Sequence, residues 1–194
     1  MNRDDFDDDK LTETTLSSET VFRGRLLHVQ LDHARLPNGN ESTREFVIHP
    51  GATAIVPLLD NGKLLLERQF RYPLKRVFIE LPAGKIDSGE DPLATGQREL
   101  LEETGYSARE WIYLAVQHPC IGYSNEVIHI YLARGLEAGE HRRDADEALQ
   151  LFEADLDECL DMVQRGEITD AKTIVGLMWA EKYLRGQWQP LSQH

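Results

Sequence analysis

Three glutamates near the middle of the chain have the types and spacing of a metal-binding group. Glu99, Glu102 and Glu103 stand at positions i, i+3 and i+4, so they share one face if this segment is helical. Like charges on one face destabilise a helix by about a few tenths of a kcal/mol per pair. A divalent cation would offset that repulsion, because hard cations such as Mg²⁺ prefer oxygen ligands. Without further features, such a trio usually belongs to a solvated surface.

The segment before the glutamates is rich in glycine and reads LPAGKIDSGE at 81–90. A backbone carbonyl from such a loop could join the oxygen ligands of a hard cation. Arg98, next to Glu99, can neutralise or orient one carboxylate through paired hydrogen bonds. The loop and the helix together predict one oxygen-rich site for a divalent cation.

The spacing of fixed residues in this region makes a surface interpretation much weaker. Gly84 is followed after five residues by Glu90, and after seven more by RELLEETGY at 98–106. At roughly one in 20 per position, a chance match of all the glycine and charged positions is on the order of one in a few million. The pattern resembles the Nudix box. Tyr106 fills its last apolar position, a mild departure that affects packing rather than chemistry.

The resemblance extends beyond the box to one branch of the family. The segments ERQFRYP at 67–73, FIELPAGKID at 78–87, GYSNE at 122–126 and ITDAKTI at 168–174 resemble the ADP-ribose pyrophosphatases. This implies hydrolysis of ADP-ribose to AMP and ribose 5-phosphate, with Mg²⁺ as the cofactor or Mn²⁺ in its place. Ile121 stands where many ADP-ribose enzymes have a proline, which keeps ADP-glucose or GDP-mannose open as the substrate. A nucleotide-sensing module without catalysis is less favoured, because all the box glutamates are kept.

The resemblance also assigns roles to individual residues. It gives Glu99 and Glu103 as direct metal ligands, Glu102 as an assisting carboxylate, and the carbonyl of Ala83 as a further ligand. Arg98 would orient the helix carboxylates, with Glu90 in support. Arg71, Glu80 and Gly84 are expected to bind the substrate, with Arg71 near the diphosphate. The water-activating base is expected in the late loop DADE at 144–147, as Glu147, with Glu126 of the GYSNE segment as the alternative base or as a further ligand.

Elements that would position these residues can be recognised from the pattern of the sequence. Strands are expected from Val21, through a hairpin at PNGN (37–40), and on through apolar runs such as ATAIVPLL. Asp91 can cap a helix that ends near Gly105, in which Gly96 lowers the helix propensity by about 1 kcal/mol. Asp155, with Glu158 as a capping box, and Asp170 begin two closing helices. Strands, a helix, more strands and then helices predict an α/β protein of α+β type with a mixed sheet.

The family resemblance makes this fold an α/β/α sandwich with a small N-terminal antiparallel β-region. We expect residues 1–19 to be a flexible acidic tail. Residues 20–48 would form the β-region, which the resemblance connects with a homodimer. Residues 49–194 would form the Nudix hydrolase domain.

Composition excludes several other classes of protein. The chain has 194 residues and a formal net charge of −13, which disfavours binding to nucleic acid because such binding depends on Lys and Arg. No apolar run approaches the roughly 20 residues of a membrane span, and the acidic N-terminus lacks the pattern of a secretory signal. Cys120 and Cys159 form no CxxC motif, so neither a disulfide scaffold nor a thiolate zinc site is expected. A cytoplasmic location is the simplest expectation.

Overall fold

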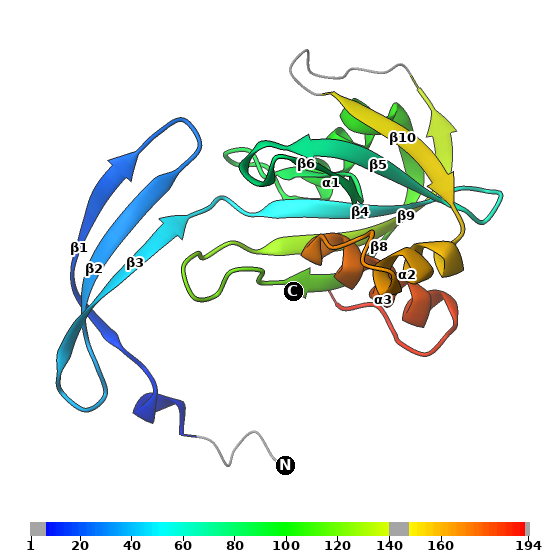
Figure 1. The fold of residues 1–194 in the computed structure, drawn as a ribbon. Helices are drawn as coiled ribbons and strands as arrows, with labels where there is room; N and C mark the ends of the chain where they lie inside the picture. The colour runs from blue at the N-terminus through cyan, green and yellow to red at the C-terminus, as the bar shows by residue number, and fades with distance from the viewer. Residues whose placement is uncertain (1–6, 140–147, 193–194) are drawn as a thin grey trace. The chain divides into compact units, whose positions relative to one another are not determined.

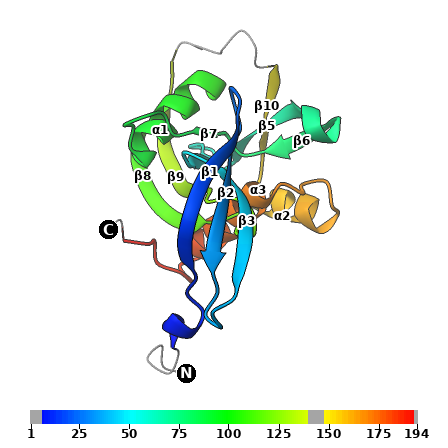
Figure 2. The ribbon, with the colours of Figure 1, turned by 90° about the vertical axis from the view of Figure 1, so that its left-hand side faces the viewer.

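Two units make up the fold, and the computed structural model describes residues 7–139 and 148–192 of them (Figure 1). The first unit is a three-stranded antiparallel sheet in the order β1–β2–β3, seen in Figure 2. Its strands are β1 (Thr14–Arg23), β2 (His28–Arg35) and β3 (Glu41–Ile48), preceded by a short 3-10 turn, η2 (Asp8–Lys10). The predicted hairpin between β2 and β3 is confirmed.

The N-terminal boundary differs from the sequence-based expectation. The flexible tail was expected to reach residue 19, but β1 already begins at Thr14. All ten residues of β1 are exposed. A strand with no buried face needs no alternation of apolar and polar residues, so its sequence carries no such signal. A turn at residues 24–27, closed by a hydrogen bond from Gly24 N to Leu27 O (2.8 Å), separates β1 from β2. The continuous strand-like pattern from Val21 is therefore two antiparallel strands.

A segment from later in the chain also belongs to this first unit. Residues Cys120–Glu126 belong to the same compact unit as the N-terminal sheet. Val47 N donates to Tyr123 O at 2.8 Å, and Asn125 N donates to Val47 O at 3.3 Å. The expected division at residue 49 into two continuous segments therefore needs this correction.

A seven-stranded mixed sheet forms the centre of the second unit. Its main order is β10–β5–β4–β9–β8, with β6 paired to β5 and β7 paired to β4. Strands β4 and β9 are parallel, and all the other pairs are antiparallel. The strands are β4 (Ala52–Leu58), β5 (Leu64–Arg71), β6 (Arg76–Glu80), β7 (Ala83–Lys85), β8 (Tyr106–Gln117), β9 (Ile128–Ala138) and β10 (Leu149–Ala154), with a 3-10 turn η3 (Tyr72–Leu74) between β5 and β6.

Helices cover both faces of this sheet, which confirms the predicted α/β/α sandwich. Alternate residues of β4 point to opposite faces. Ile55 packs with Leu100 in the layer of α1 (Pro92–Glu99), whereas Val56 packs in the larger core with Leu177 of α3 (Ala171–Leu184). The second helix of that layer is α2 (Leu156–Gln164). These apolar contacts fix the sheet from which the loop before α1 projects.

Among the α-helices of the described residues, the predicted N-cap is confirmed for α1 and α3 but not for α2. Asp91 Oδ1 accepts a hydrogen bond from Ala94 N at 2.9 Å, and Asp170 Oδ2 accepts one from Thr173 N at 3.0 Å, as expected for N-caps. Asp155 precedes α2, but its side chain makes no capping hydrogen bond. The predicted capping box with Glu158 is therefore wrong; Glu158 instead pairs with Arg165.

The helix that carries the glutamates changes its geometry partway along. After α1 the chain continues as a π-helical segment, η4 (Leu100–Thr104), before Gly105. The expectation of one regular helix does not hold here, and π-helical turns are often found at functional sites. Gly96 has a packing role in α1, because a Cβ there would lie 3.0 Å from Thr53 Cγ2 and 3.3 Å from the Trp111 ring. Across the described residues, no helix has the length and apolar character needed to cross a membrane.

Candidate active site

The segment that carries the glutamates packs tightly against strand β7. A Cβ built on Gly84 would lie 1.8 Å from Glu99 Oε1, so this carboxylate occupies the space that any other residue would need. Glu103 Oε2 accepts a hydrogen bond from Ala83 N at 3.0 Å. Glu103 is almost fully buried, with 3% exposure. The backbone of residues 83–84 therefore lies against two carboxylates, as the spacing of the glycine and the glutamates predicts.

Arg98 is the centre of a second set of contacts. Its Nη1 donates to Glu99 Oε1 at 2.7 Å and to Glu102 Oε2 at 3.0 Å. Its Nε and Nη2 donate to the two carboxylate oxygens of Glu90, at 3.1 and 3.0 Å, and Nη2 also reaches the carbonyl of Lys85 at 3.1 Å. One guanidinium thus holds three carboxylates, which explains how so many acidic residues are kept together.

These contacts affect the ionisation of Glu90 most strongly. Hydrogen bonds from Arg98, and then from Thr95 Oγ1 and Asp87 N, stabilise its carboxylate and lower its pKa to about 2. The same pairing, with Glu90 first and then Glu99 and Glu102, raises the pKa of Arg98 above its already high ordinary value. Arg98 and Glu90 therefore stay charged over the whole physiological range.

The donor set of the site fits a hard divalent cation. Glu99, Glu102, Glu103 and the carbonyl of Ala83 supply only oxygen atoms, which suit Mg²⁺ or Mn²⁺. Among residues 7–139 and 148–192, no three carboxylate, imidazole or thiol groups already converge in a metal-binding arrangement. In this arrangement Glu99 and Glu102 both accept hydrogen bonds from Arg98. Glu102, with 37% side-chain exposure, is the most accessible of the three glutamates.

Arg71 and Glu80, both expected on the substrate side, form a bidentate ion pair. Arg71 Nε and Nη2 donate to Glu80 Oε1 and Oε2 at 2.7 and 2.8 Å. Burial opposes ionisation of Glu80, but the hydrogen bonds and charges of Arg71 and Lys172 outweigh it and lower its pKa. The sequence did not single out Lys172, which donates to Glu80 from 92 residues further along the chain. The only signal was its position in the ITDAKTI segment.

The two candidates for the base are placed differently. Glu147 lies outside the described residues. Glu126 belongs to the first unit, where its Oε1 lies 3.6 Å from His49 Nδ1 and its backbone N donates to Ser124 Oγ at 3.2 Å. His49 was not expected beside Glu126, because the two are far apart in sequence.

A cavity of about 650 Å³ lies at the start of α1, away from the glutamate cluster at the other end of this helix. It is mainly apolar and is lined by Asp91, Pro92, Leu93, Tyr113, Val116, His129, Tyr131, Leu191 and Ser192. Its volume is in the usual range for small-molecule sites, but none of its described lining residues is a lysine or arginine that could bind a diphosphate. We therefore base the functional assignment on the carboxylates.

Comparison with known proteins gives the class to which this fold and site belong. Residues 48–175 match the NUDIX domain, which is more than half of the chain. The chain therefore belongs to the Nudix family, and the resemblance seen in its sequence is confirmed. Residues 13–47 match a second model, the nucleoside diphosphate sugar hydrolase N-terminal domain.

Several individual proteins within reach of this family are similar to the chain over most of its length. It is 38% identical to the ADP-ribose pyrophosphatase of Bacillus subtilis, over 88% of this chain and 94% of the relative. It is 40% identical to the methanol dehydrogenase activator of Bacillus methanolicus, over 87% and 92%. The GDP-mannose pyrophosphatase of Yersinia enterocolitica is 31% identical over 68% and 73%. Among solved structures, the crystal structure of an ADP compounds hydrolase superimposes with a TM-score of 0.82 and 27% identity, covering 91% of this chain and 97% of that one.

Proposed function

We propose that this chain hydrolyses the diphosphate bond of ADP-ribose to give AMP and ribose 5-phosphate. The observation that carries the proposal is the contact of Glu99 and Glu103 with the backbone of residues 83–84. This contact brings two carboxylates against the backbone of the glycine-containing strand β7, in a chain that belongs to the Nudix family and is 38% identical to the ADP-ribose pyrophosphatase of Bacillus subtilis.

Mg²⁺ is the proposed cofactor, with Mn²⁺ in its place. Glu99, Glu103 and the carbonyl of Ala83 would hold it, and Glu102 would assist. When bound, the divalent ion supplies neutralisation of the diphosphate charge and a more acidic water. Arg98 would keep the carboxylates oriented while no ion is bound, because its hydrogen bonds hold Glu99 and Glu102 together.

The other side chains would bind the substrate and move a proton. Arg71 would lie beside the diphosphate, where a guanidinium can form paired hydrogen bonds with phosphate oxygens. A carboxylate base, Glu147 or alternatively Glu126, would accept a proton from the attacking water. As the new bond from this water oxygen to phosphorus forms, the bond from phosphorus to the bridging oxygen breaks, and AMP and ribose 5-phosphate separate.

A second candidate substrate is another nucleoside diphosphate sugar, such as GDP-mannose or ADP-glucose. Ile121, an 84% exposed residue, favours this candidate because it stands where many ADP-ribose enzymes have a proline. The match to the GDP-mannose pyrophosphatase of Yersinia enterocolitica supports the same alternative. The chemistry at the carboxylates would be unchanged, since the same diphosphate bond is split.

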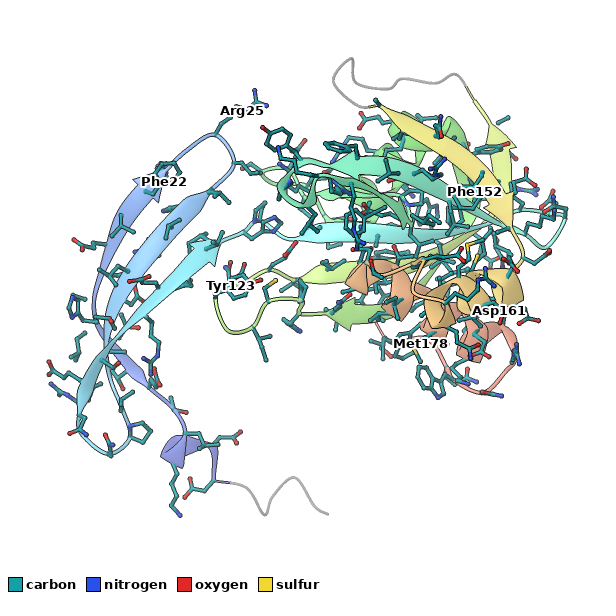
Figure 3. All side chains as sticks on the ribbon, viewed as in Figure 1. Phe22, Arg25, Tyr123, Phe152, Asp161 and Met178 are labelled. Carbon is teal, nitrogen blue, oxygen red and sulfur yellow. The ribbon has the colours of Figure 1, made fainter. Side chains whose placement is uncertain are left out.

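We further propose that the N-terminal sheet forms a homodimer and that the enzyme works in the cytoplasm. Strand β1 is an edge strand of its sheet and all its residues are exposed. Its apolar side chains Leu16 (42%) and Phe22 (54%, labelled in Figure 3) are surfaces that a partner would cover. Free Cys120 and Cys159 suit a reducing compartment. Sedimentation should give a dimer at micromolar concentration, and a monomer would contradict this part of the proposal.

The experiment that tests the proposed function is a substrate panel with identification of products. ADP-ribose, ADP-glucose, GDP-mannose and NADH are incubated with the protein, each with Mg²⁺ and with EDTA. Preferential, EDTA-sensitive conversion of ADP-ribose to AMP and ribose 5-phosphate supports the proposal. Preference for another sugar nucleotide supports the second candidate, and binding without hydrolysis at any metal concentration would overturn both in favour of a sensing role.

A further inference from the structure

The first turn of α3 reaches the Arg71–Glu80 pair through one lysine. Lys172 Nζ donates to Glu80 Oε2, the same oxygen that accepts from Arg71 Nη2. It also donates to Asp170 Oδ2 at 2.9 Å. Glu80 is 2% exposed and the Lys172 side chain 12% exposed, so this is a buried network.

The backbone around this lysine is fixed to the strand that carries Glu80. Asp170 Oδ2 accepts hydrogen bonds from Thr173 N at 3.0 Å and from Thr173 Oγ1 at 2.6 Å. Thr173 Oγ1 in turn accepts one from Leu81 N at 2.9 Å. Leu81 directly follows Glu80, so Thr173, the residue after Lys172, joins the start of α3 to the end of β6.

The charges around Arg71 show what the lysine balances. Glu67 is fully buried and stands opposite Glu80 in the register of β5 and β6. A hydrogen bond with Glu80 raises the pKa of Arg71 most, and the charges of Glu80, Glu67 and Asp170 act in the same direction. If the cation at position 172 were removed, the buried Glu80 carboxylate would lose one of the two cations that hold it, Lys172 and Arg71. Glu80 could then shift, and Arg71 would lose the fixed partner that orients it.

Arg71 keeps one edge available for a ligand. Its bonds to Glu80 use Nε and Nη2 but not Nη1, and its side chain is 41% exposed. A cleft of about 200 Å³ adjoins it, lined by Arg71, Leu74, Phe78, Glu80, Asp170 and Lys172. The Arg71 guanidinium is therefore held by Glu80 on one edge and can be reached by a ligand from the cleft.

We propose that Lys172 is a positioning residue that fixes Arg71, through Glu80, for contact with the anionic part of the substrate. The proposal rests on the proposed function, which puts Arg71 beside the diphosphate. Lys172 does not touch the substrate; it keeps the Glu80 carboxylate in the place where Arg71 is correctly aimed.

The test compares Lys172→Met, Lys172→Arg and a control on the same helix, Lys182→Met. Lys182 lies near the end of α3 and pairs with Glu181 at 3.2 Å. For each protein, KM and kcat for ADP-ribose, the half-activating Mg²⁺ concentration and the melting temperature are measured. The Kd for ADP-ribose without metal is measured as well, so that binding is tested apart from turnover.

Loss of Lys172 should weaken binding more than turnover. Lys172→Met should raise KM and Kd by about 10-fold or more, the size expected when a buried, hydrogen-bonded charge loses its partner. A lost contact that is equal in ground and transition states leaves kcat within about threefold. The half-activating Mg²⁺ concentration should not change, Lys172→Arg should restore KM to within about threefold, and Lys182→Met should behave as wild type.

Two results would overturn the inference. One is a Lys172→Met protein that melts earlier but keeps wild-type KM and Kd, which would make the lysine purely structural. The other is a loss in Lys172→Arg as large as in Lys172→Met. A wild-type protein that binds ADP-ribose without hydrolysing it would overturn the proposed function, while the Kd comparison would still decide the role of Lys172.

Discussion

The carboxylate of Glu99 occupies the place where a side chain at residue 84 would have to be. A Cβ on Gly84 would come within 1.8 Å of Glu99 Oε1, far inside any possible contact. Strand β7 therefore accepts only glycine at this position if the carboxylate is to stay against the backbone of residue 84. This relation links two ends of the motif that are separated by fourteen residues in sequence.

Gly84→Ala should therefore damage catalysis by moving Glu99. A displacement of about 1 Å in a catalytic group can reduce the rate by roughly 10²-fold, and we expect a fall in kcat of that order. Steady-state kinetics with a metal titration measures it, and the melting temperature tests whether the fold is kept. A folded Gly84→Ala protein with wild-type kcat would show that the Glu99 position is not needed.

Glu90 should make the stability of the protein depend on acid pH. Its pKa is lowered from 4.5 to about 2, so its contribution is present above the unfolded value and is lost as the pH falls through the folded value. Glu90→Gln should lower the free energy of unfolding by on the order of 2 kcal/mol near pH 7. That difference should shrink between about pH 4.5 and pH 2, where the wild-type carboxyl also becomes neutral. Urea unfolding at several pH values checks this, and a constant difference would refute it.

Gly96→Ala should destabilise the protein although alanine is the better helix former. The new methyl group would lie 3.0 Å from Thr53 Cγ2 and 3.3 Å from the Trp111 ring. Overpacking of this kind costs about 1–3 kcal/mol, against a gain in propensity of about 1 kcal/mol. Urea unfolding should place Gly96→Ala below wild type, with Gln97→Ala, on the exposed side of α1, as the neutral control. Equal or greater stability of Gly96→Ala would contradict the close packing of α1 on β4.

The choice between the two candidate bases can be made by paired substitutions. Glu147→Gln should lower kcat by roughly 10² to 10⁴ and leave the affinity for ADP-ribose largely intact, because a general base acts on the water in the transition state. Glu126→Gln serves as the comparison under the same conditions. If Glu147→Gln turns over at the wild-type rate and Glu126→Gln does not, the base is Glu126.

Much of the fold could be predicted because its signals are local. Asp91 and Asp170 cap their helices, and the apolar run of β4 is a buried strand, as the pattern of residues indicates. Strand β1 could not be predicted in full, because a strand exposed on both sides has no apolar periodicity. The π-helical segment η4 was missed because a constant angle of 100° per residue was assumed for the whole helix.

The part of the site that could be predicted is the part whose residues lie in one sequence motif. The spacing of Gly84, Arg98 and the three helix glutamates predicts that they come together, and the structure has them on β7, α1 and η4. The bond between Lys172 and Glu80 joins segments 92 residues apart. Such a contact depends on how α3 packs on the sheet, and no local pattern contains that information.

The measurement that bears most directly on the carboxylate site is the kcat of Glu103→Gln for ADP-ribose at saturating Mg²⁺. Glu110→Gln is the control, since Glu110 is exposed on β8 and pairs only with Arg134 in the described contacts. We expect Glu103→Gln to lower kcat by on the order of 10² or more, because it removes a charge that would hold the catalytic ion. Glu110→Gln should keep the wild-type kcat. A folded Glu103→Gln protein with near-wild-type kcat would contradict the assignment of this glutamate to the active site.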